Sequence, residues 1–242
     1  MITEENFLDF KCPYCGELNS FPRDSAGFVR ECVNCREALI VPEEGSEVGL
    51  KIPIPITTSK LVLRRLIASD QKDLVELFSD EEIFLYDNRN PPEEEEIMRW
   101  LESEHHVKLT TPDEVFFLGI EAKDGGKLVG ELALRFTDSQ RLQAQLTIWV
   151  NRNHRRKGFG LEAVAAILGF CFEQIHLHRV TAMCDTQNTA ACRLCEKAGL
   201  NREGESVKDR FVRGEWMSSV WYAALEDEYG ESGCSPAEES ST

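Results

Sequence analysis

Between about residues 59 and 225, short apolar runs alternate with segments in which apolar residues recur every three or four positions. Runs such as 61–66 are typical of β-strands, whereas the spacing of Leu161, Val164, Leu168 and Cys171 is typical of one helix face. The pattern predicts strands at 61–66, 115–122, 128–136, 143–150, 179–184, 200–207 and 217–224. It predicts helices after a cap at Ser69-Asp70, over 93–106, after residue 160 and over 189–197. The order is β-α-α-β-β-β-α-β-α-β-β.

Composition narrows the class of partner. The chain has 242 residues and a formal net charge of −16, so a polyanion would be repelled and we do not expect nucleic-acid binding. No apolar run approaches the roughly 20 residues that a membrane helix needs, and the acidic start of the chain lacks a signal-peptide pattern. With nine cysteines and no export signal, we expect a cytoplasmic location with thiols or metal ligation rather than disulfides.

Four cysteines near the N-terminus form two C-x2-C pairs with sixteen residues between the pairs, namely Cys12 with Cys15 and Cys32 with Cys35. This spacing is typical of a four-cysteine zinc site, because a two-residue gap lets both thiolates of a pair reach one tetrahedral ion. The segment between the pairs reads as two short strands around a turn, so residues 1–42 look like a zinc ribbon. Four thiolates fill the coordination sphere, so we expect a structural Zn²⁺. The alternative is a set of unrelated cytosolic thiols.

Two segments flank the region of alternating elements. Prolines and glycines interrupt the pattern over residues 43–58, which we interpret as a linker between the ribbon and a domain at 59–225. Residues 226–242 contain no basic residue and are predicted to be a disordered acidic tail.

The clearest candidate for binding chemistry is Arg155-Arg156-Lys157-Gly158-Phe159-Gly160, at the start of the third expected helix. Glycine has no Cβ, so a phosphate can approach the backbone closely. The first turn of a helix offers free N–H groups and the positive end of the helix dipole. With Arg152 and His154, the segment is the densest basic cluster of an acidic chain. We interpret it as a pyrophosphate site, and the alternative is a solvated basic turn.

Three motifs, taken in order, resemble the GNAT acetyltransferase superfamily from about residue 59 to 225. They are the opening strand 61–66 with Asp70, then Arg155-x-x-Gly158-x-Gly160, then Asn188-x-x-Ala191…Glu196-Lys197-x-Gly199-Leu200-x-x-Glu203-Gly204. The branch that the chain resembles contains the ribosomal-protein N-terminal acetyltransferases and related small-molecule acetyltransferases. The resemblance implies an α/β (α+β) fold, with a mixed, mostly antiparallel sheet and flanking helices, and acetyl-CoA as cosubstrate.

The resemblance also implies the cofactor contacts. Backbone N–H groups of the loop would hold the pyrophosphate, and basic side chains beside them would add charge. Family members splay the fourth and fifth strands, so that pantetheine pairs with the fourth strand. Asn188 would contact the thioester arm, cap a helix, or do both. The implied set is Ile148, Val150, Arg155, Arg156, Lys157, Gly158, Phe159, Gly160, Leu161 and Asn188.

Acetyl transfer in this family is direct attack of a neutral amine on the thioester. At pH 7, neutralising an alkylammonium costs roughly 4–5 kcal/mol and an α-amine only about 1.4 kcal/mol, so a general base matters more for the former. Two expected groups are missing, because Gln145 stands where relatives often have a glutamate and Ala191 where the branch has a serine. Tyr222 is the candidate acid and Glu131 the candidate base. The alternatives are a half-buried strand aromatic and an exposed strand carboxylate.

These observations predict an N-acetyltransferase that moves an acetyl group from acetyl-CoA to a primary amine. The acceptor is a protein N-terminus or a small amine; the negative net charge favours a cationic one. The ribbon is expected to dock a protein partner. The missing serine and glutamate motivate a rival, a non-catalytic acyl-CoA-binding module with the ribbon as adaptor. A second rival, a nucleic-acid-reading ribbon, is disfavoured by the few basic residues in 1–42.

Overall fold

The computed structural model describes residues 6–86, 90–103, 115–138 and 142–229. The N-terminal part forms two small sheets. One pairs β1 with β2 in antiparallel fashion, and the other has the order β3-β4-β5. The expected two strands around a turn are both present, but they do not pair with each other. Their bounds are β1 Phe7–Lys11, β2 Leu18–Pro22, β3 Val29–Glu31, β4 Ala38–Ile40 and β5 Leu50–Lys51.

The rest of the chain builds one eight-stranded sheet in the order β12-β13-β11-β10-β9-β8-β7-β6. All neighbours are antiparallel except β10 and β11, which run parallel. This confirms the predicted fold class. The bounds are β6 Ile56–Thr57, β7 Leu61–Arg64, β8 Val115–Ala122, β9 Leu128–Phe136, β10 Gln143–Val150, β11 Arg179–Asp185, β12 Asn201–Val212 and β13 Glu215–Leu225.

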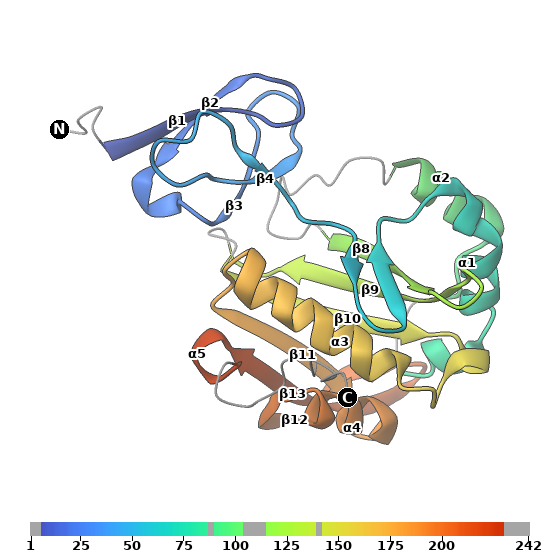
Figure 1. Cartoon of the computed structure of the whole chain (residues 1–242). Coiled ribbons are helices and arrows are strands. Elements are labelled where there is room, and N and C mark those ends of the chain that lie inside the picture. The colour runs from blue at the N-terminus through green and yellow to red at the C-terminus, as the bar shows by residue number, and fades with distance from the viewer. Residues whose placement is uncertain (1–5, 87–89, 104–114, 139–141, 230–242) are drawn as a thin grey trace, which may run out of the picture.

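Helices cover both faces of this sheet (Figure 1). Helices α1 and α2 bury apolar side chains with Leu128 and Trp149, whereas α3 and α4 pack on the other face with Leu132, Leu146 and Val180. A π-helical turn, Phe170–Gln174, extends α3. No helix among the described residues is long and apolar enough to cross a membrane. The bounds are α1 Gln71–Phe78, α2 Glu94–Ser103, α3 Phe159–Gly169, α4 Thr189–Lys197 and α5 Glu226–Tyr229.

Some local expectations need correction. Asp70 does not cap α1 with its side chain. Its carboxylate instead accepts the backbone N–H of Ile67 at 2.8 Å and pairs with Arg64 at 2.7 Å. The second helix is described over Glu94–Ser103, and residues 104–106 of its predicted range lie outside the described residues. Residues 43–58, predicted as a linker, contain β5 and β6. The predicted tail begins with α5, and residues 230–242 lie outside the described part of the chain.

The N-terminal unit shares a hydrophobic core with the large sheet. Val29, Ala38 and Ile40 are buried in the same cluster as strands β7 to β11 and helix α3. A Cβ atom on Gly27 would lie 3.1 Å from the ring of His176, just beyond the π-helical turn after α3. The contact is therefore at the C-terminal end of α3, and Figure 1 shows the N-terminal unit above that end.

Candidate functional site

Strands β10 and β11 diverge after a short parallel pairing, and the space between their diverging halves is here named the β10–β11 cleft. Their parallel pairing is limited to Gln143–Gln145 with Arg179–Thr181, although β10 continues to Val150 and β11 to Asp185. Beyond Gln145 the two strands part, while β10 keeps its pairing with β9 along its whole length. The second half of β10 therefore presents a sheet edge in the interior of the molecule, which is the geometry that an added strand requires.

The direction of the β10 backbone decides which groups face this cleft. Asn151 donates its backbone N–H to Val129 of β9 at 2.9 Å. In an antiparallel strand, the backbone N–H and C=O groups of every second residue point to the same neighbouring strand. The backbone groups of Trp149 therefore also point to β9, whereas those of Ile148 and Val150 point into the cleft. The sequence predicted these two residues as backbone contacts for pantetheine. The carbonyl oxygen of Val150 accepts the Nε–H of Arg155 at 3.1 Å, so only its N–H remains for that role.

The glycine loop lies where β10 leads into α3. Gly158 has a φ of +86° and stands at the N-cap of α3, a left-handed conformation that favours glycine. The first i to i−4 bond of α3 runs from the N–H of Glu162 to the carbonyl oxygen of Gly158, at 3.0 Å. The backbone N–H groups of Phe159, Gly160 and Leu161 precede this bond and therefore have no acceptor within the helix. An anion at this helix start would receive all three.

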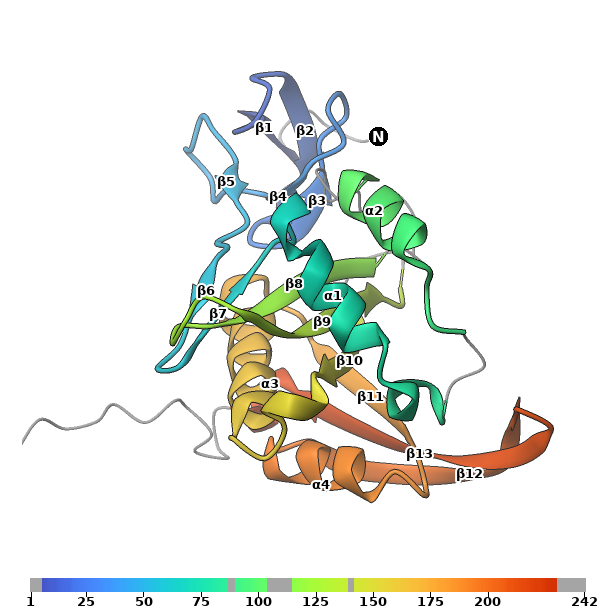
Figure 2. The same cartoon turned by 90° about the vertical axis from the view of Figure 1, so that its right-hand side faces the viewer.

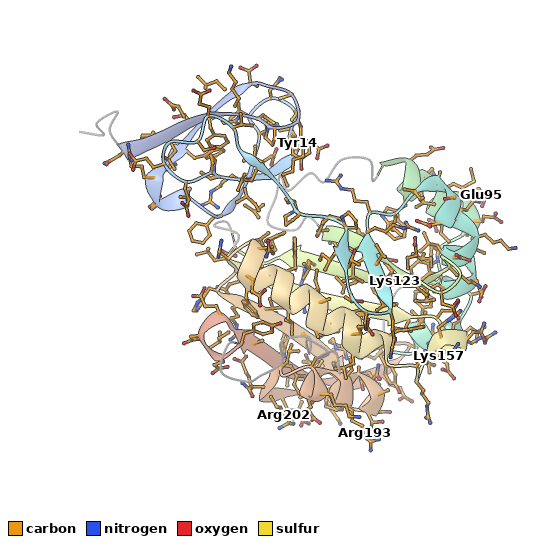
Figure 3. The ribbon with its side chains drawn as sticks, viewed as in Figure 1. Tyr14, Glu95, Lys123, Lys157, Arg193 and Arg202 are labelled. Atoms are coloured by element: carbon orange, nitrogen blue, oxygen red, sulfur yellow. The ribbon has the colours of Figure 1, made fainter. Side chains whose placement is uncertain are left out.

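The basic residues of the loop divide into two groups. Arg152, Arg156 and Lys157 are exposed, and Lys157 lies far from the N-terminal unit with its labelled Tyr14 (Figure 3). Arg155 differs, because its Nη2 lies 2.6 Å from the carboxylate of Asp80 and its Nη1 lies 2.7 Å from that of Glu82. The sequence predicted Arg155 as a phosphate contact. In the structure its guanidinium instead forms ion pairs with these two acids and a hydrogen bond with the carbonyl oxygen of Val150.

Asn188 caps α4. Its side-chain oxygen accepts the N–H of Ala191 at 3.1 Å, which is the standard N-cap contact. The preceding turn is fixed by Asp185, whose carboxylate accepts the N–H of Gln187 at 2.8 Å. The capping role that the sequence left open is therefore present, and the helix start lies directly beyond the cleft-facing end of β11.

Tyr222 on β13 is buried, with 2% of its surface exposed. Its hydroxyl donates to the carboxylate of Glu196 on α4 at 3.1 Å. Burial, with the nearby Cys192 thiol and Glu196, raises the pKa of Tyr222 above its usual value. The phenol therefore carries its proton at neutral pH, as a general acid must.

Glu131 lies at the centre of the sheet on β9 and is fully buried, which overturns the alternative of an exposed carboxylate. It is directly opposite Trp149 on one side and Gly119 on the other. Cross-strand partners point to the same face, and Trp149 packs with Phe78 in the α1–α2 core. Tyr222, in contrast, belongs to the core of the α3–α4 face. The two candidate catalytic residues thus lie on opposite faces of the sheet.

The four N-terminal cysteines converge on one point. Their Sγ atoms all lie within 4.8 Å of one another. The separations between Cys12 and Cys35 and between Cys15 and Cys32 are both 3.7 Å. Four Zn–S bonds of about 2.3 Å in a tetrahedron place sulfurs about 3.8 Å apart, so the donor set fits Zn²⁺. Among the described residues, no other group of three or more cysteines, histidines or acids is arranged in this way.

Sequence reasoning missed a second arginine. Arg210 on β12 donates to Asp185 at 2.9 Å, to the hydroxyl of Ser219 at 2.7 Å and to the backbone oxygen of Tyr86 at 2.9 Å. Asp185 has a completely buried side chain. No local pattern signals these contacts, because their partners lie up to 124 positions away in the sequence.

Comparisons with known proteins agree with this geometry. The model of the acetyltransferase (GNAT) domain family matches residues 60–201. An uncharacterized N-acetyltransferase of Bacillus subtilis, YnaD, is 28% identical over 176 residues, covering 72% of this chain and 98% of the relative.

Solved structures show the same fold. A GNAT-family acetyltransferase from Bacillus anthracis has a TM-score of 0.64 and 24% identity, covering 72% of this chain and 99% of its own. A spermidine N-acetyltransferase from Vibrio cholerae, solved with CoA and spermine, has a TM-score of 0.62 and 22% identity, covering 71% and 99%. The family match spans more than half of the chain, which therefore belongs to the GNAT acetyltransferases and is an acyltransferase enzyme.

Proposed function

We propose that this enzyme transfers an acetyl group from acetyl-CoA to a primary amine by direct attack of the amine on the thioester. The observation that carries the proposal is the free edge of β10 beyond Gln145, which leads directly to the Gly158 turn and the start of α3. A strand-like pantetheine arm suits the edge, and a pyrophosphate suits the helix start. Both features lie at the same end of the cleft.

The residues take the following roles in this proposal. The N–H groups of Phe159, Gly160 and Leu161 hold the pyrophosphate, and exposed Arg156 and Lys157 add positive charge. Backbone groups of Ile148 and the N–H of Val150 align the pantetheine arm, and Asn188 contacts the same arm while it caps α4. This assignment leaves Arg155 out, since its guanidinium is committed to Asp80 and Glu82.

Acid and base act from opposite sides of the sheet. Tyr222, on the α3–α4 face, donates its phenolic proton to the sulfur that leaves as the C–S bond breaks. Glu131, on the α1–α2 face, accepts a proton from the bound ammonium, directly or through water, and the neutral amine that results attacks the thioester carbon. Entry of the cosubstrate from one face and the amine from the other would bring both partners to the cleft. Backbone N–H groups of β10 that face the cleft would stabilise the oxyanion.

The acceptor is a small amine or a protein N-terminus, and the formal net charge of −16 favours a cationic one. A buried base such as Glu131 would help an alkylamine more than an α-amine, because the alkylammonium holds its proton more tightly. We also assign a structural Zn²⁺ to the four cysteines. It would cross-link the ribbon and take no part in the chemistry, since four thiolates leave no open position. The narrower ribosomal-protein branch and docking of a protein partner on the ribbon remain predictions.

The test is an acetyl-transfer assay with a panel of acceptors, namely spermine, free lysine and short peptides with unblocked N-termini. Release of free thiol and a product mass 42 Da above an acceptor (one acetyl for one hydrogen) would support the proposal. Gly160→Leu is the matched variant, because it adds bulk at the helix start where a Cβ itself meets only ordinary contacts at 3.5 Å or more. Wild-type protein that binds CoA but acetylates no amine would refute the transferase assignment, and unchanged CoA affinity in Gly160→Leu would refute the site.

A further inference from the structure

The segment Asp80–Tyr86, which follows α1, is held at both ends by arginines from distant parts of the chain. Arg155 pairs with Asp80 and Glu82 at one end, at 2.6 and 2.7 Å. Arg210 donates to the backbone oxygen of Tyr86 at the other end, at 2.9 Å. Figure 2 shows the chain below α1 beside the outer part of the β12–β13 hairpin that carries Arg210.

Each arginine also holds one side of the cleft. Arg155 donates to Val150, the last residue of β10, at 3.1 Å. Arg210 donates to Asp185, the last residue of β11, at 2.9 Å. Hydrogen bonds of Arg155 therefore connect the end of β10 to one end of the segment Asp80–Tyr86, and those of Arg210 connect its other end to the end of β11. The segment is therefore linked to the ends of both strands that part.

Burial makes these contacts hard to exchange for water. The side chains of Asp80 and Asp185 are 3% and 0% exposed. A desolvated carboxylate is tolerated only while its partners are in place, and both acids are also satisfied by local N–H groups, from Glu82 at 3.2 Å and Gln187 at 2.8 Å. Loss of either arginine would leave a buried charge and release one end of the segment.

We propose that Arg155 and Arg210 are positioning residues that hold Asp80–Tyr86 at the ends of β10 and β11, and that Arg155 transmits occupation of the cofactor loop to this segment. The proposal rests on the cofactor site assigned above. Arg155 immediately precedes the turn whose N–H groups would bind the pyrophosphate, so a bound pyrophosphate that orders this turn also orders the Arg155 backbone. The guanidinium of Arg155 then orders Asp80 and Glu82, with which it pairs. The contacts that hold the segment are then most firmly fixed when the cosubstrate is bound.

The test combines calorimetric titration with CoA and hydrogen exchange of the peptide that covers residues 79–86. In the wild type, CoA is expected to slow exchange in this peptide at least about fivefold. Arg155→Met is expected to speed exchange in the free protein and to abolish the CoA-dependent protection, while the Kd for CoA changes less than about threefold. Arg210→Met is expected to speed exchange as well. Asp80→Asn is the milder variant, should Arg155→Met fold poorly, and is expected to act in the same direction.

Arg202→Met is the matched control. Arg202 lies on the same hairpin as Arg210, and its ion pair with Glu205 is exposed, at 52% and 42%. It should leave exchange at 79–86 unchanged. If Arg155 is a phosphate ligand instead, its loss removes a charge-assisted bond and weakens CoA at least about tenfold, with exchange at 79–86 unaltered. That result overturns the proposal, as does wild-type CoA binding without protection of 79–86. Absence of CoA binding to the wild type would defeat the cofactor site itself, and this proposal with it.

Discussion

Removal of zinc should destabilise the acetyltransferase sheet, not only the ribbon. Without its ion the four-cysteine unit loses its main cross-link, and β3 and β4 can no longer hold their positions. Val29, Ala38 and Ile40 then leave the core that they share with the large sheet. Withdrawal of a buried valine or isoleucine costs about 1.5–3 kcal/mol each, so the loss is about 3–6 kcal/mol in all. At about 2–4 °C per kcal/mol for a chain of this size, the melting temperature should fall by about 6–24 °C.

The assay is a melting curve of zinc-loaded and chelated protein, with the zinc content of each sample measured by mass spectrometry. We expect one zinc per chain before chelation. Cys32→Ser should reproduce the loss of stability, and Cys192→Ser, which alters a thiol outside the ribbon, should not. Complete removal of zinc with a change in melting temperature below about 2 °C would refute the shared-core reasoning.

The same experiment separates stability from binding. The ribbon contacts His176, two residues beyond the π-helical turn, and the cofactor loop lies at the other end of α3. The α-helix and π-helical turn contain 11 and 5 residues, so at 1.5 Å per residue the two sites are about 24 Å apart. Below the melting range, chelated protein should therefore bind CoA with an affinity within about threefold of the zinc-loaded form.

Three further outcomes are expected. Tyr222→Phe should lower kcat at least about 100-fold with little change in the KM for acetyl-CoA, measured as initial rates of thiol release; an unchanged kcat would remove Tyr222 as the acid. Glu131→Gln should reduce turnover of alkylamines more than that of α-amines, because only the former need strong help in losing a proton; equal losses in a side-by-side assay would argue for a structural carboxylate. Hydrogen bonds from Lys127, Asn151 and Asn153 lower the pKa of Glu76 to about 2 from its usual value of 4.5. Its contribution to stability is therefore present above pH 4.5 and lost as the pH falls towards 2. The difference in melting temperature between wild type and Glu76→Gln should shrink over that window, and a pH-independent difference would contradict the ionic role.

Local signals were sufficient for most elements of the sheet. The strands at 115–122, 128–136 and 143–150 begin and end where the short apolar runs predict, because a strand buried in a sheet is written as a local run of apolar residues. The helix at 189–197 was also predicted with its observed bounds, because Asn188 marks its start and Gly199, at a φ of +86°, lies just beyond its end. The cysteine spacing likewise predicted that four thiols would meet.

Long-range partners decided the rest. The sequence places Arg155 in a basic loop beside two glycines. Nothing within that loop indicates that its guanidinium will pair with Asp80 and Glu82, which lie more than 70 positions earlier. Burial of Glu131 depends in the same way on neighbours from β8 and β10 that only the assembled sheet supplies.

By itself, the sequence determined the periodicity of the elements, the glycine turn at the start of α3 and the four thiols that converge, because each depends on residues close together in the chain. Only the tertiary structure decided where β10 and β11 part, which arginines link Asp80–Tyr86 to the ends of these strands, and that the ribbon joins the core of the sheet. Those features arise from contacts between distant segments, and an exposed charge and a buried, paired one look the same in a single sequence.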